Sequence, residues 1–461
     1  MLDTLRLLLS RSKGTSYAEA RYHARTVSEV NFANGRLERI RMVESAGCGL
    51  RVLVEGCWGF SSTSDVEKLS ESLEQAMSMA RVLAGSKKRR VAGLADSKMV
   101  HGRFEPSVRG RLQDVGIEEK VRVTKEAEAA ARRHSKVVKT ASATYRDMID
   151  YKAIVNSDGA QVEISDSKPE FSVVAIAKSG GQSVTANEGV GITGGWDDLF
   201  QTSHLDYAYA AADKAEKLVQ AKYANGEKTT IILDPGMVGL LCHEAIGHTV
   251  EADFVLSGSV VKDRIGQKVA NELVTLVDSG QADISGNPAG TIGIDDEGVQ
   301  AGRTAVIEDG VLKSFLHNRE SAHEFGVAST GNARAFTYSD EPLIRMRNTY
   351  IEPRFDKLDD MIKETRHGYL VKGARNGQAD ANAEFMFGAQ EAYLIENGEI
   401  KELMRGASIS GNAFDALLSV DMVGDGFQYD IGMGYCGKYQ LAKVDGGGPH
   451  VRCTAIIGGM Q

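Results

Sequence analysis

The stretch from His243 to His248, His-Glu-Ala-Ile-Gly-His, holds the residues of this chain best suited to chemistry. Neutral imidazole nitrogens bind Zn²⁺, and a glutamate that does not itself bind the metal can accept a proton from the metal-bound water. Glu244 directly follows the first histidine and is of the type that such a base requires. The stretch therefore suggests a zinc centre and makes hydrolysis the leading hypothesis.

The spacing of the two histidines is unusual for a helix. They stand at positions i and i+5, which an undistorted α-helix separates by about 140° around its axis. The histidines of a His-Glu-x-x-His helix, at i and i+4, share one face instead. We therefore expect a distortion, and Gly247 is the residue that could unwind the last turn or allow a π-bulge. On spacing alone, a helix with one core histidine and one surface histidine stays open.

A catalytic zinc also needs a third protein ligand and an open position for water or substrate. Cys436 is the best candidate, because it stands in a glycine-rich, basic stretch that we read as a loop. There, Lys438 and exposed backbone amides would stabilise a thiolate. An exposed loop cysteine without a metal is the alternative. The remaining cysteines fit better as small buried hydrophobic residues: Cys48, Cys57, Cys242 and Cys453.

The elements that precede this stretch predict an N-terminal α+β domain over residues 1–224. Strand-like runs with hairpin turns alternate with amphipathic helices, and this pattern occurs before and after residue 100, which suggests an internal duplication. The expected strands are 22–30, 37–44, 47–54 and three or four between 137 and 190, and the expected helices are 2–9, 65–83, 117–133 and 205–224.

A polar segment, residues 224–228, is the best linker candidate, and residues 225–461 form the second predicted domain. A buried strand over 229–234 and a turn at Pro235-Gly236 lead into the metal-site helix. Beyond it the chain reads mostly as strand and loop, with hairpin turns at 308–310 and 396–398 and a helix over 356–365. The fold class is therefore α+β, with a C-terminal β-dominated domain that carries the metal-site helix.

Composition excludes several classes of function. The chain has 461 residues, 42% of them hydrophobic, and a formal charge of −9. That charge argues against a nucleic-acid partner, which usually meets a basic stripe. No apolar run reaches the length of a membrane span. Five cysteines at scattered spacings do not form a disulfide framework, so we expect a cytoplasmic location, where an unpaired thiolate also survives best.

Several stretches of the chain together resemble one known family. The His243–His248 motif is followed by Glu251 and Asp253, and later come Cys436-Gly-Lys438 and a terminal Gly458-Gly459. These features are similar to the TldD branch of the TldD/PmbA metalloprotease family. Further stretches that resemble its blocks are residues 48–60, 329–334, 342–349 and 377–388.

This resemblance implies zinc held by His243, His248 and Cys436, with Glu244 as the general base. It also implies hydrolysis of small or unfolded polypeptides, and a dimer formed either with an inactive PmbA/TldE-like paralogue or with a second copy. The chain departs from the family pattern Cys-Gly-Lys-x-Gly-Gln, because it lacks the second glycine before Gln440. A metal-free scaffold or modulator subunit, and a zinc hydrolase of non-peptide amides, are the alternatives.

Other polar residues are candidates for supporting roles. Glu251 and Asp253 could orient a ligand imidazole, ligate the metal themselves, or serve only as surface or capping residues. Arg345, Arg347 and Asn348 could bind a peptide backbone or terminal carboxylate, since a guanidinium pairs with a carboxylate through two hydrogen bonds. A structural salt bridge is the alternative for the arginines.

Overall fold

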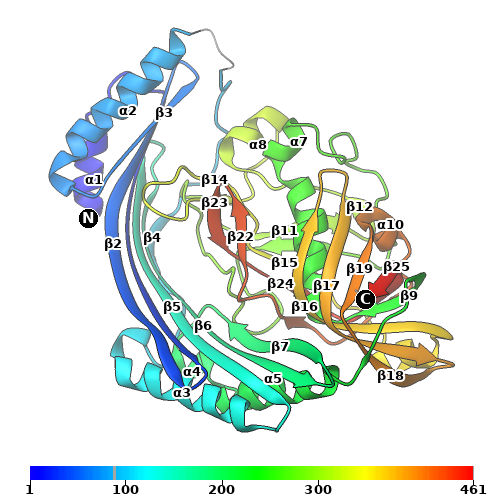
Figure 1. The fold of residues 1–461 in the computed structure, drawn as a ribbon. Helices are drawn as coiled ribbons and strands as arrows, with labels where there is room; N and C mark the ends of the chain where they lie inside the picture. Colours follow the sequence, from blue (N-terminus) through cyan, green and yellow to red (C-terminus); the bar gives the residue numbers. More distant parts are fainter. Residues whose placement is uncertain (87–89, 460–461) are drawn as a thin grey trace.

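The first region of the protein is built on one long, curved sheet (Figure 1). The computed structural model describes residues 1–86 and 90–459. Among these residues the sheet has seven strands in the order β3-β2-β1-β5-β6-β4, and β7 pairs with β6. The strands are β1 Tyr17–Ala33, β2 Arg36–Val54, β3 Cys57–Thr63, β4 His101–Phe104, β5 Val138–Asn156, β6 Gln161–Ser179 and β7 Gln182–Gly191.

Two groups of helices cover this sheet at opposite ends (Figure 1). The apolar side chains of α1 and α2 pack on β1–β3 around Leu50 and Leu73, whereas α3 and α5 pack on β5–β7 around Phe171 and Ala211. The helices of this region are α1 Leu2–Leu9, η1 Val66–Lys68, α2 Leu69–Ala84, η2 Leu112–Asp114, α3 Ile117–Arg133, α4 Trp196–Leu199 and α5 His204–Leu218. The internal duplication remains a prediction.

The second region contains two larger sheets with a helix between them. Within the described residues, one sheet runs β16-β9-β25-β19-β17-β18-β8 with β20 beside β25, and the other runs β12-β11-β10-β15-β24-β21. The first has strands β8 Lys222–Tyr223, β9 Glu227–Leu233, β16 His367–Ala379, β17 Glu384–Glu396, β18 Glu399–Arg405, β19 Ala407–Asn412, β20 Met422–Val423 and β25 Val451–Gly459. The second has β10 Leu276–Ser279, β11 Arg303–Glu308, β12 Val311–Leu312, β15 Asn348–Ile351, β21 Gln428–Tyr429 and β24 Asp445–Gly448.

Two short hairpins and several short helices complete the second region. The hairpins are β13 Ala333–Arg334 with β14 Leu343–Ile344, and β22 Tyr435–Lys438 with β23 Gln440–Lys443. The helices are α6 Pro235–Leu240, η3 Leu241–Gly247, η4 His248–Val250, α7 Ala252–Leu256, α8 Arg319–Phe325, α9 Leu358–Lys363 and α10 Ala413–Leu418. The α6–η3 segment contacts β16 of one sheet and β15 and β24 of the other, so it lies in the apolar core of this region.

The α+β class and the β-dominated second region agree with the sequence analysis. The turn at Asn34-Gly35 has both residues at positive φ, and the helix over 117–133 forms with the expected bounds. The helix expected over 205–224 ends at Leu218 instead, because residues 222–223 form β8 and pair with β18. The domain boundary at residue 224 remains a prediction. No helix in the described part of the chain is long and apolar enough to cross a membrane.

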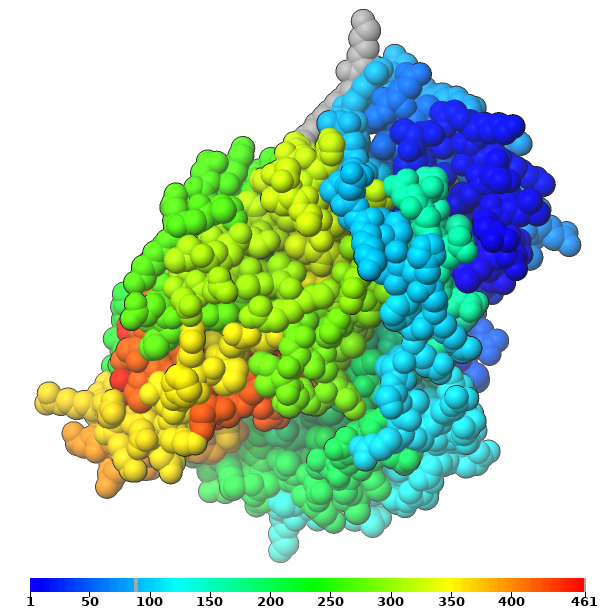
Figure 2. Space-filling model, turned by 180° about the vertical axis from the view of Figure 1, so that it is seen from behind, coloured from blue at the N-terminus to red at the C-terminus, as the bar shows by residue number. Residues whose placement is uncertain are grey.

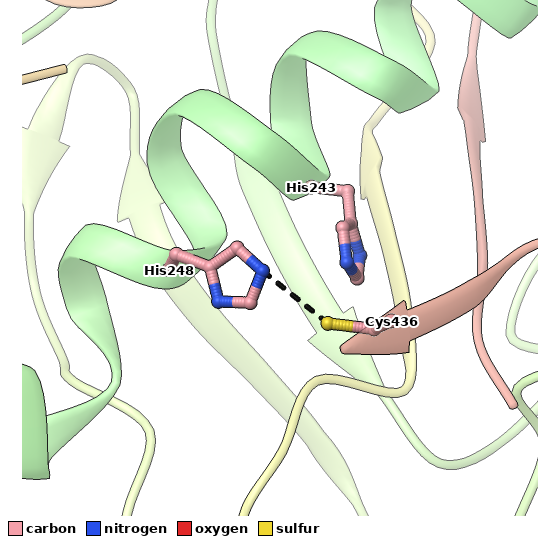
Figure 3. Close-up of side chains that lie close together, drawn as sticks. All are labelled: His243, His248 and Cys436. Atoms are coloured by element: carbon pink, nitrogen blue, oxygen red, sulfur yellow. Dashed lines mark hydrogen bonds between the residues drawn. The ribbon is translucent and has the colours of Figure 1, made fainter. Parts of the chain in front are cut away.

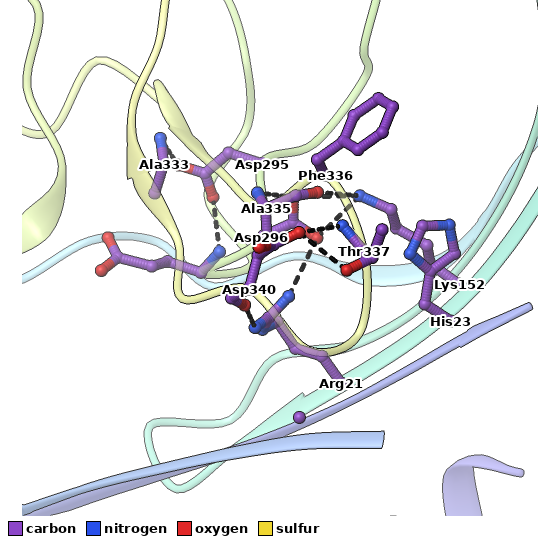
Figure 4. Close-up of polar contacts among 12 residues, drawn as sticks. Arg21, His23, Lys152, Asp295, Asp296, Ala333, Ala335, Phe336, Thr337 and Asp340 are labelled. Atoms are coloured by element: carbon purple, nitrogen blue, oxygen red, sulfur yellow. Dashed lines mark hydrogen bonds and ion pairs between the residues drawn. The ribbon is translucent and has the colours of Figure 1, made fainter. Parts of the chain in front are cut away.

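The two regions meet along the concave face of the first sheet, and from behind the first region covers one side of the second (Figure 2). Charged side chains are buried at this junction (Figure 4). Lys152 on β5 lies 2.9 Å from the Asp296 carboxylate, and Arg51 on β2 lies 2.8 Å from the Glu297 carboxylate. Arg21 donates a hydrogen bond to the Asp340 carbonyl. Ion pairs and hydrogen bonds thus hold the second region in the curve of the sheet.

Candidate metal centre

The helix that carries the His-Glu motif changes its hydrogen-bonding pattern at the motif. The Asp234 carboxylate accepts a hydrogen bond from the Met237 amide, and Pro235 occupies the first helical turn, where its missing N–H costs nothing. The turn expected at Pro235-Gly236 was therefore wrong, because these residues begin α6. From Leu241 to Gly247 the segment is a π-helix, whose bonds join residues five apart.

This π-helix confirms the distortion that the histidine spacing required. It brings His243 and His248 onto the same side, with their ring centroids 5.3 Å apart. Gly247 contributes through close packing, because a Cβ at that position would lie 1.9 Å from the Met346 sulfur. A larger residue there would push the segment away from its neighbour and disturb the approach of the two rings.

Cys436 comes from a distant strand and completes a compact group with the two histidines (Figure 3). The possible ligand atoms of His243, His248 and Cys436 all lie within 4.8 Å of one another, and the Cys436 Sγ lies 3.3 Å from the His248 Nε2. A tetrahedral zinc with nitrogen and sulfur ligands holds them about 3.5 Å apart. The group is therefore close to the size that a zinc ion needs.

The surroundings of Cys436 differ from the sequence analysis. Cys436 lies on β22 and is 5% exposed, so the prediction of a loop with exposed amides was wrong. The strand continues into a tight hairpin in which Lys438 pairs with Gln440 across Tyr439 alone. Tyr439 has a φ of 59°, a conformation that glycine adopts more easily. The shortened motif thus closes a hairpin without the usual glycine.

Charge in the group is distributed between the thiol and the imidazoles. Burial raises the pKa of the Cys436 thiol, but the adjacent His243 and His248 rings lower this pKa to about 4. Burial lowers the pKa of His248, but its bonds to Cys436 and Glu251 raise this pKa to about 10. Without a metal, Cys436 is thus a thiolate next to an imidazolium. Thiolate is the form that binds metals, and His248 would release a proton on binding.

His243 is the member of the group whose ring nitrogens make no hydrogen bond among the described residues, although the ring lies close enough to Cys436 to lower the pKa of that thiol. Its side chain is buried at 2% exposure, and within the described residues neither ring nitrogen makes a hydrogen bond. Buried polar atoms in native proteins are nearly always paired, so each exception needs an explanation. A metal ion held with His248 and Cys436 would supply the missing contact, and the donor set of two imidazoles and one thiolate suits zinc.

Glu251 forms a hydrogen bond with His248 at Nδ1, the ring nitrogen that does not contact Cys436. Its carboxylate lies 2.9 Å from the His248 Nδ1 and is fully buried, so the Nε2 is left to face Cys436. Lys438 lies 3.2 Å from Glu251 and 2.7 Å from Asp253. The expectation that Lys438 stabilises the thiolate was therefore wrong, because its ammonium pairs with these two carboxylates. Glu251 has the position of a residue that orients a ligand imidazole.

Arg345 and Arg347, for which substrate binding and a structural salt bridge were both open, have structural roles. Arg345 is fully buried and donates hydrogen bonds to the carbonyls of Cys436 and Gln440, each 2.7 Å away. Arg347 is paired with the Asp278 carboxylate at 2.8 Å. Sequence reasoning missed that Arg345 anchors the hairpin of Cys436, since no local pattern links residues 91 positions apart.

An open cavity gives access to the group. It has a volume of about 1260 Å³, and its walls include His243, Glu244 and Cys436. Its walls also include residues of β7 and of the segment that follows it in the first region. Glu244 is partly exposed, and it makes no hydrogen bond or ion pair with any residue that the structure describes. A carboxylate in this position is free to contact a molecule in the cavity.

Comparisons with known proteins agree over nearly the whole chain. Three parts match domains of a single family: PmbA/TldA metallopeptidase domain 1 over residues 18–80, the central domain over 110–219 and the C-terminal domain over 226–457. A metalloprotease of Methanothermobacter thermautotrophicus is 34% identical, with 98% of each chain covered. A protein of Saccharolobus solfataricus named zinc metalloprotease TldD homolog is 29% identical, with 97% of each chain covered.

Solved structures of the same fold include proteins with other descriptions. A candidate modulator of a DNA gyrase from Thermotoga maritima matches with a TM-score of 0.82 at 22% identity. TldE from Thermococcus kodakarensis matches with a TM-score of 0.78 at 19% identity. The matches cover 99% of both chains in each case. These likenesses establish the fold.

Proposed function

We propose, since the chain belongs to the PmbA/TldA metallopeptidase family, that it is a zinc-dependent peptidase acting on small or unfolded polypeptides. His243, His248 and Cys436 would hold the metal. The observation that carries this assignment is the buried His243 ring with no hydrogen-bond partner among the described residues, beside a thiolate and a second imidazole. The name of the relative from Saccharolobus solfataricus also includes zinc.

Glu244 would act as the general acid and base. A bound zinc would polarise the scissile carbonyl and lower the pKa of a water molecule. Glu244 follows His243 on the π-helix and lines the same cavity, so its carboxylate can accept the proton of the attacking water. The same group then returns the proton to the leaving amine. Glu251 would keep His248 in the orientation that presents its Nε2.

The cavity supports a polypeptide as substrate. Its volume of about 1260 Å³ exceeds the roughly 300–1,000 Å³ of sites for small molecules. An extended chain segment would fit such a space, whereas a compact folded domain would not reach a zinc ligand as deeply buried as His243. We propose in addition that the protein works as a dimer, with a second copy or with a paralogue like the structural neighbour TldE.

The test is the zinc content of the purified native protein, compared with two cysteine variants. We expect about one zinc per chain in the native protein, much less in Cys436→Ser, and the native value in Cys453→Ser. Cys453 is an equally buried cysteine on β25, so it controls for loss of a core thiol. Native protein without zinc after incubation with the metal would overturn the proposal and favour a metal-free scaffold or modulator subunit.

A further inference from the structure

The cavity that opens onto the metal centre has an excess of acidic side chains in its walls. Five carboxylates are among its lining residues: Glu188, Asp198, Glu244, Asp430 and Asp445. Arg375 is the one lysine or arginine among the lining residues that the structure describes. Its guanidinium already donates a hydrogen bond to the Thr185 carbonyl of β7. A molecule that enters the cavity therefore meets a negatively charged surface.

Three of the five carboxylates have partners within the protein. They are Asp198 with Arg109, Glu188 with Lys214, and Asp445 with three backbone amides. Glu244, the fourth, is the proposed general base. The fifth is Asp430, whose side chain makes no hydrogen bond or ion pair with any residue in the ranges 1–86 and 90–459. The folded chain itself therefore gives Asp430 no partner.

The backbone holds Asp430 in place, and its side chain is open to the cavity. The Asp430 amide donates a hydrogen bond to the Gly446 carbonyl at 3.0 Å, directly after β21. One oxygen of the carboxylate lies close to the first turn of α6, since a Cβ at Gly236 would be 2.6 Å from it. The helix does not need this carboxylate, because Asp234 already caps the turn through the Met237 amide.

A negative charge on Asp430 is unfavourable in the protein by itself. Enclosure by the cavity walls raises the pKa of Asp430 to about 7, and the carboxylates of Asp234, Glu188 and Asp445 act in the same direction. Lys214 opposes them, but it is paired with Glu188. A further cation beside Asp430 would favour the ionised carboxylate and would itself be bound by it.

We propose that Asp430 selects substrates that have an arginine or lysine side chain about three residues from the bond that is cut. This inference rests on the proposed peptidase function. The carboxylate lies against Gly236, and positions 236 and 243 on one helical segment are about 10 Å apart at 1.5 Å per residue. An extended peptide advances about 3.3 Å per residue, so about three residues span this distance. The basic side chain would then form a charged hydrogen bond with Asp430.

A series of peptides tests the preference and its position. Each is a neutral, unstructured peptide with an acetylated amino end, in which a single arginine is moved from one position to the next. We expect the cut, located by mass spectrometry, to move with the arginine and to stay two to four residues from it on one side. At pH 8, where Asp430 is ionised, kcat/KM should be about tenfold higher than for the same peptide with glutamine.

Variants of Asp430 separate recognition from a structural role. Asp430→Asn should cleave the arginine and glutamine peptides equally well, with native kcat/KM on the glutamine peptide. Asp430→Lys should prefer a peptide with glutamate at that position, a reversal that loss of structure would not produce. Asp425→Asn is the matched control, because Asp425 precedes β21, is paired with Lys357 and does not line the cavity. It should keep the native preference.

Binding distinguishes failure of this inference from failure of the proposed function. Glu244→Gln protein should bind a fluorescent arginine peptide about tenfold more tightly than the glutamine peptide, as measured by anisotropy. Equal cleavage and equal binding of both peptides would overturn the role of Asp430 but leave the peptidase. A binding preference that Asp430→Asn removes, without cleavage of any peptide by native protein, would support Asp430 and overturn the peptidase. Neither cleavage nor a binding preference would overturn both.

Discussion

Two groups of buried polar side chains differ in how completely they are paired. At the junction of the two regions, Arg51 contacts Glu19 at 3.0 Å and Glu297 at 2.8 Å. At the metal centre, His243 is just as deeply buried, but its ring nitrogens make no hydrogen bond within the described residues. Single atoms at the junction, such as Glu19 Oε1 and Arg51 Nε, also make no hydrogen bond, but each of these side chains has another partner. His243 has a hydrogen bond at neither ring nitrogen, and a buried side chain that is wholly without a hydrogen bond marks a place where a ligand belongs.

The first prediction concerns Glu244, whose carboxylate lines the cavity beside the metal centre. Glu244→Gln should lower kcat on an unfolded peptide by about 10²–10⁴-fold, because the variant cannot accept a proton. Zinc content should stay at the native value, since Glu244 is not a proposed ligand. Peptide turnover and elemental analysis on the same sample check both statements. Glu308→Gln, at the exposed end of β11, is the control; native activity in Glu244→Gln would remove the proposed role.

The second prediction concerns the ion pairs at the junction of the two regions. Arg51→Met should lower the free energy of unfolding by about 3–5 kcal/mol, because Glu297 would lose its ion-pair partner while buried and Glu19 would keep only Arg21, at 3.5 Å. Denaturant unfolding measures the loss, and the folded variant should still bind zinc. Arg6→Met, which removes an exposed pair with Asp3, should cost less than about 1 kcal/mol. Equal losses in the two variants would contradict a structural role for the junction.

The contrast also shows what the sequence could and could not predict. The spacing of His243 and His248 predicted a distorted helix on the condition that both bind one metal, because helix geometry fixes where residues five apart must point. The apolar periodicity of residues 117–133 likewise predicted α3. Local signals of this kind depend on neighbours within a few residues, and they carry most of the fold class.

What the sequence could not predict depends on contacts between distant segments. The contact of Cys436 with His248, the pairing of Lys438 with Glu251, and the bond from Arg345 to the hairpin join residues that are 91 to 188 positions apart. A glycine-rich stretch reads as a loop unless the sheet that receives it is known. The ligand set itself came from a family resemblance, and the structure adds the geometry in which those side chains lie.

The third prediction tests the support behind the metal centre. Glu251→Gln keeps the size of the side chain but removes the charge that faces His248 Nδ1. We expect zinc affinity to fall by about 10–100-fold, as for other partners of ligand histidines. Competition with a chromogenic chelator measures the affinity. Asp253→Asn is the matched control, because Asp253 contacts Lys438 but no ligand, and it should change the affinity much less.

The fourth prediction applies one substitution to both groups. In zinc-free protein, His243→Leu should raise the free energy of unfolding by about 1 kcal/mol, because it replaces an unpaired buried ring with an apolar side chain of similar size. His23→Leu at the junction should lower it instead, since His23 lies 2.9 Å from the Asp150 carboxylate and that partner would be left with one bond fewer. Denaturant unfolding with a chelator present measures both.

The direction of these two changes in the free energy of unfolding, rather than their magnitude, tests the difference between the two groups. Added zinc should stabilise the native protein and His23→Leu alike, because both keep the ligand group, but it should not stabilise His243→Leu. A His243→Leu variant that is less stable than the native protein without zinc would mean that His243 has a partner of its own in the metal-free protein. The two buried groups would then not differ in kind, and the case for a metal at His243 would rest on the family resemblance alone.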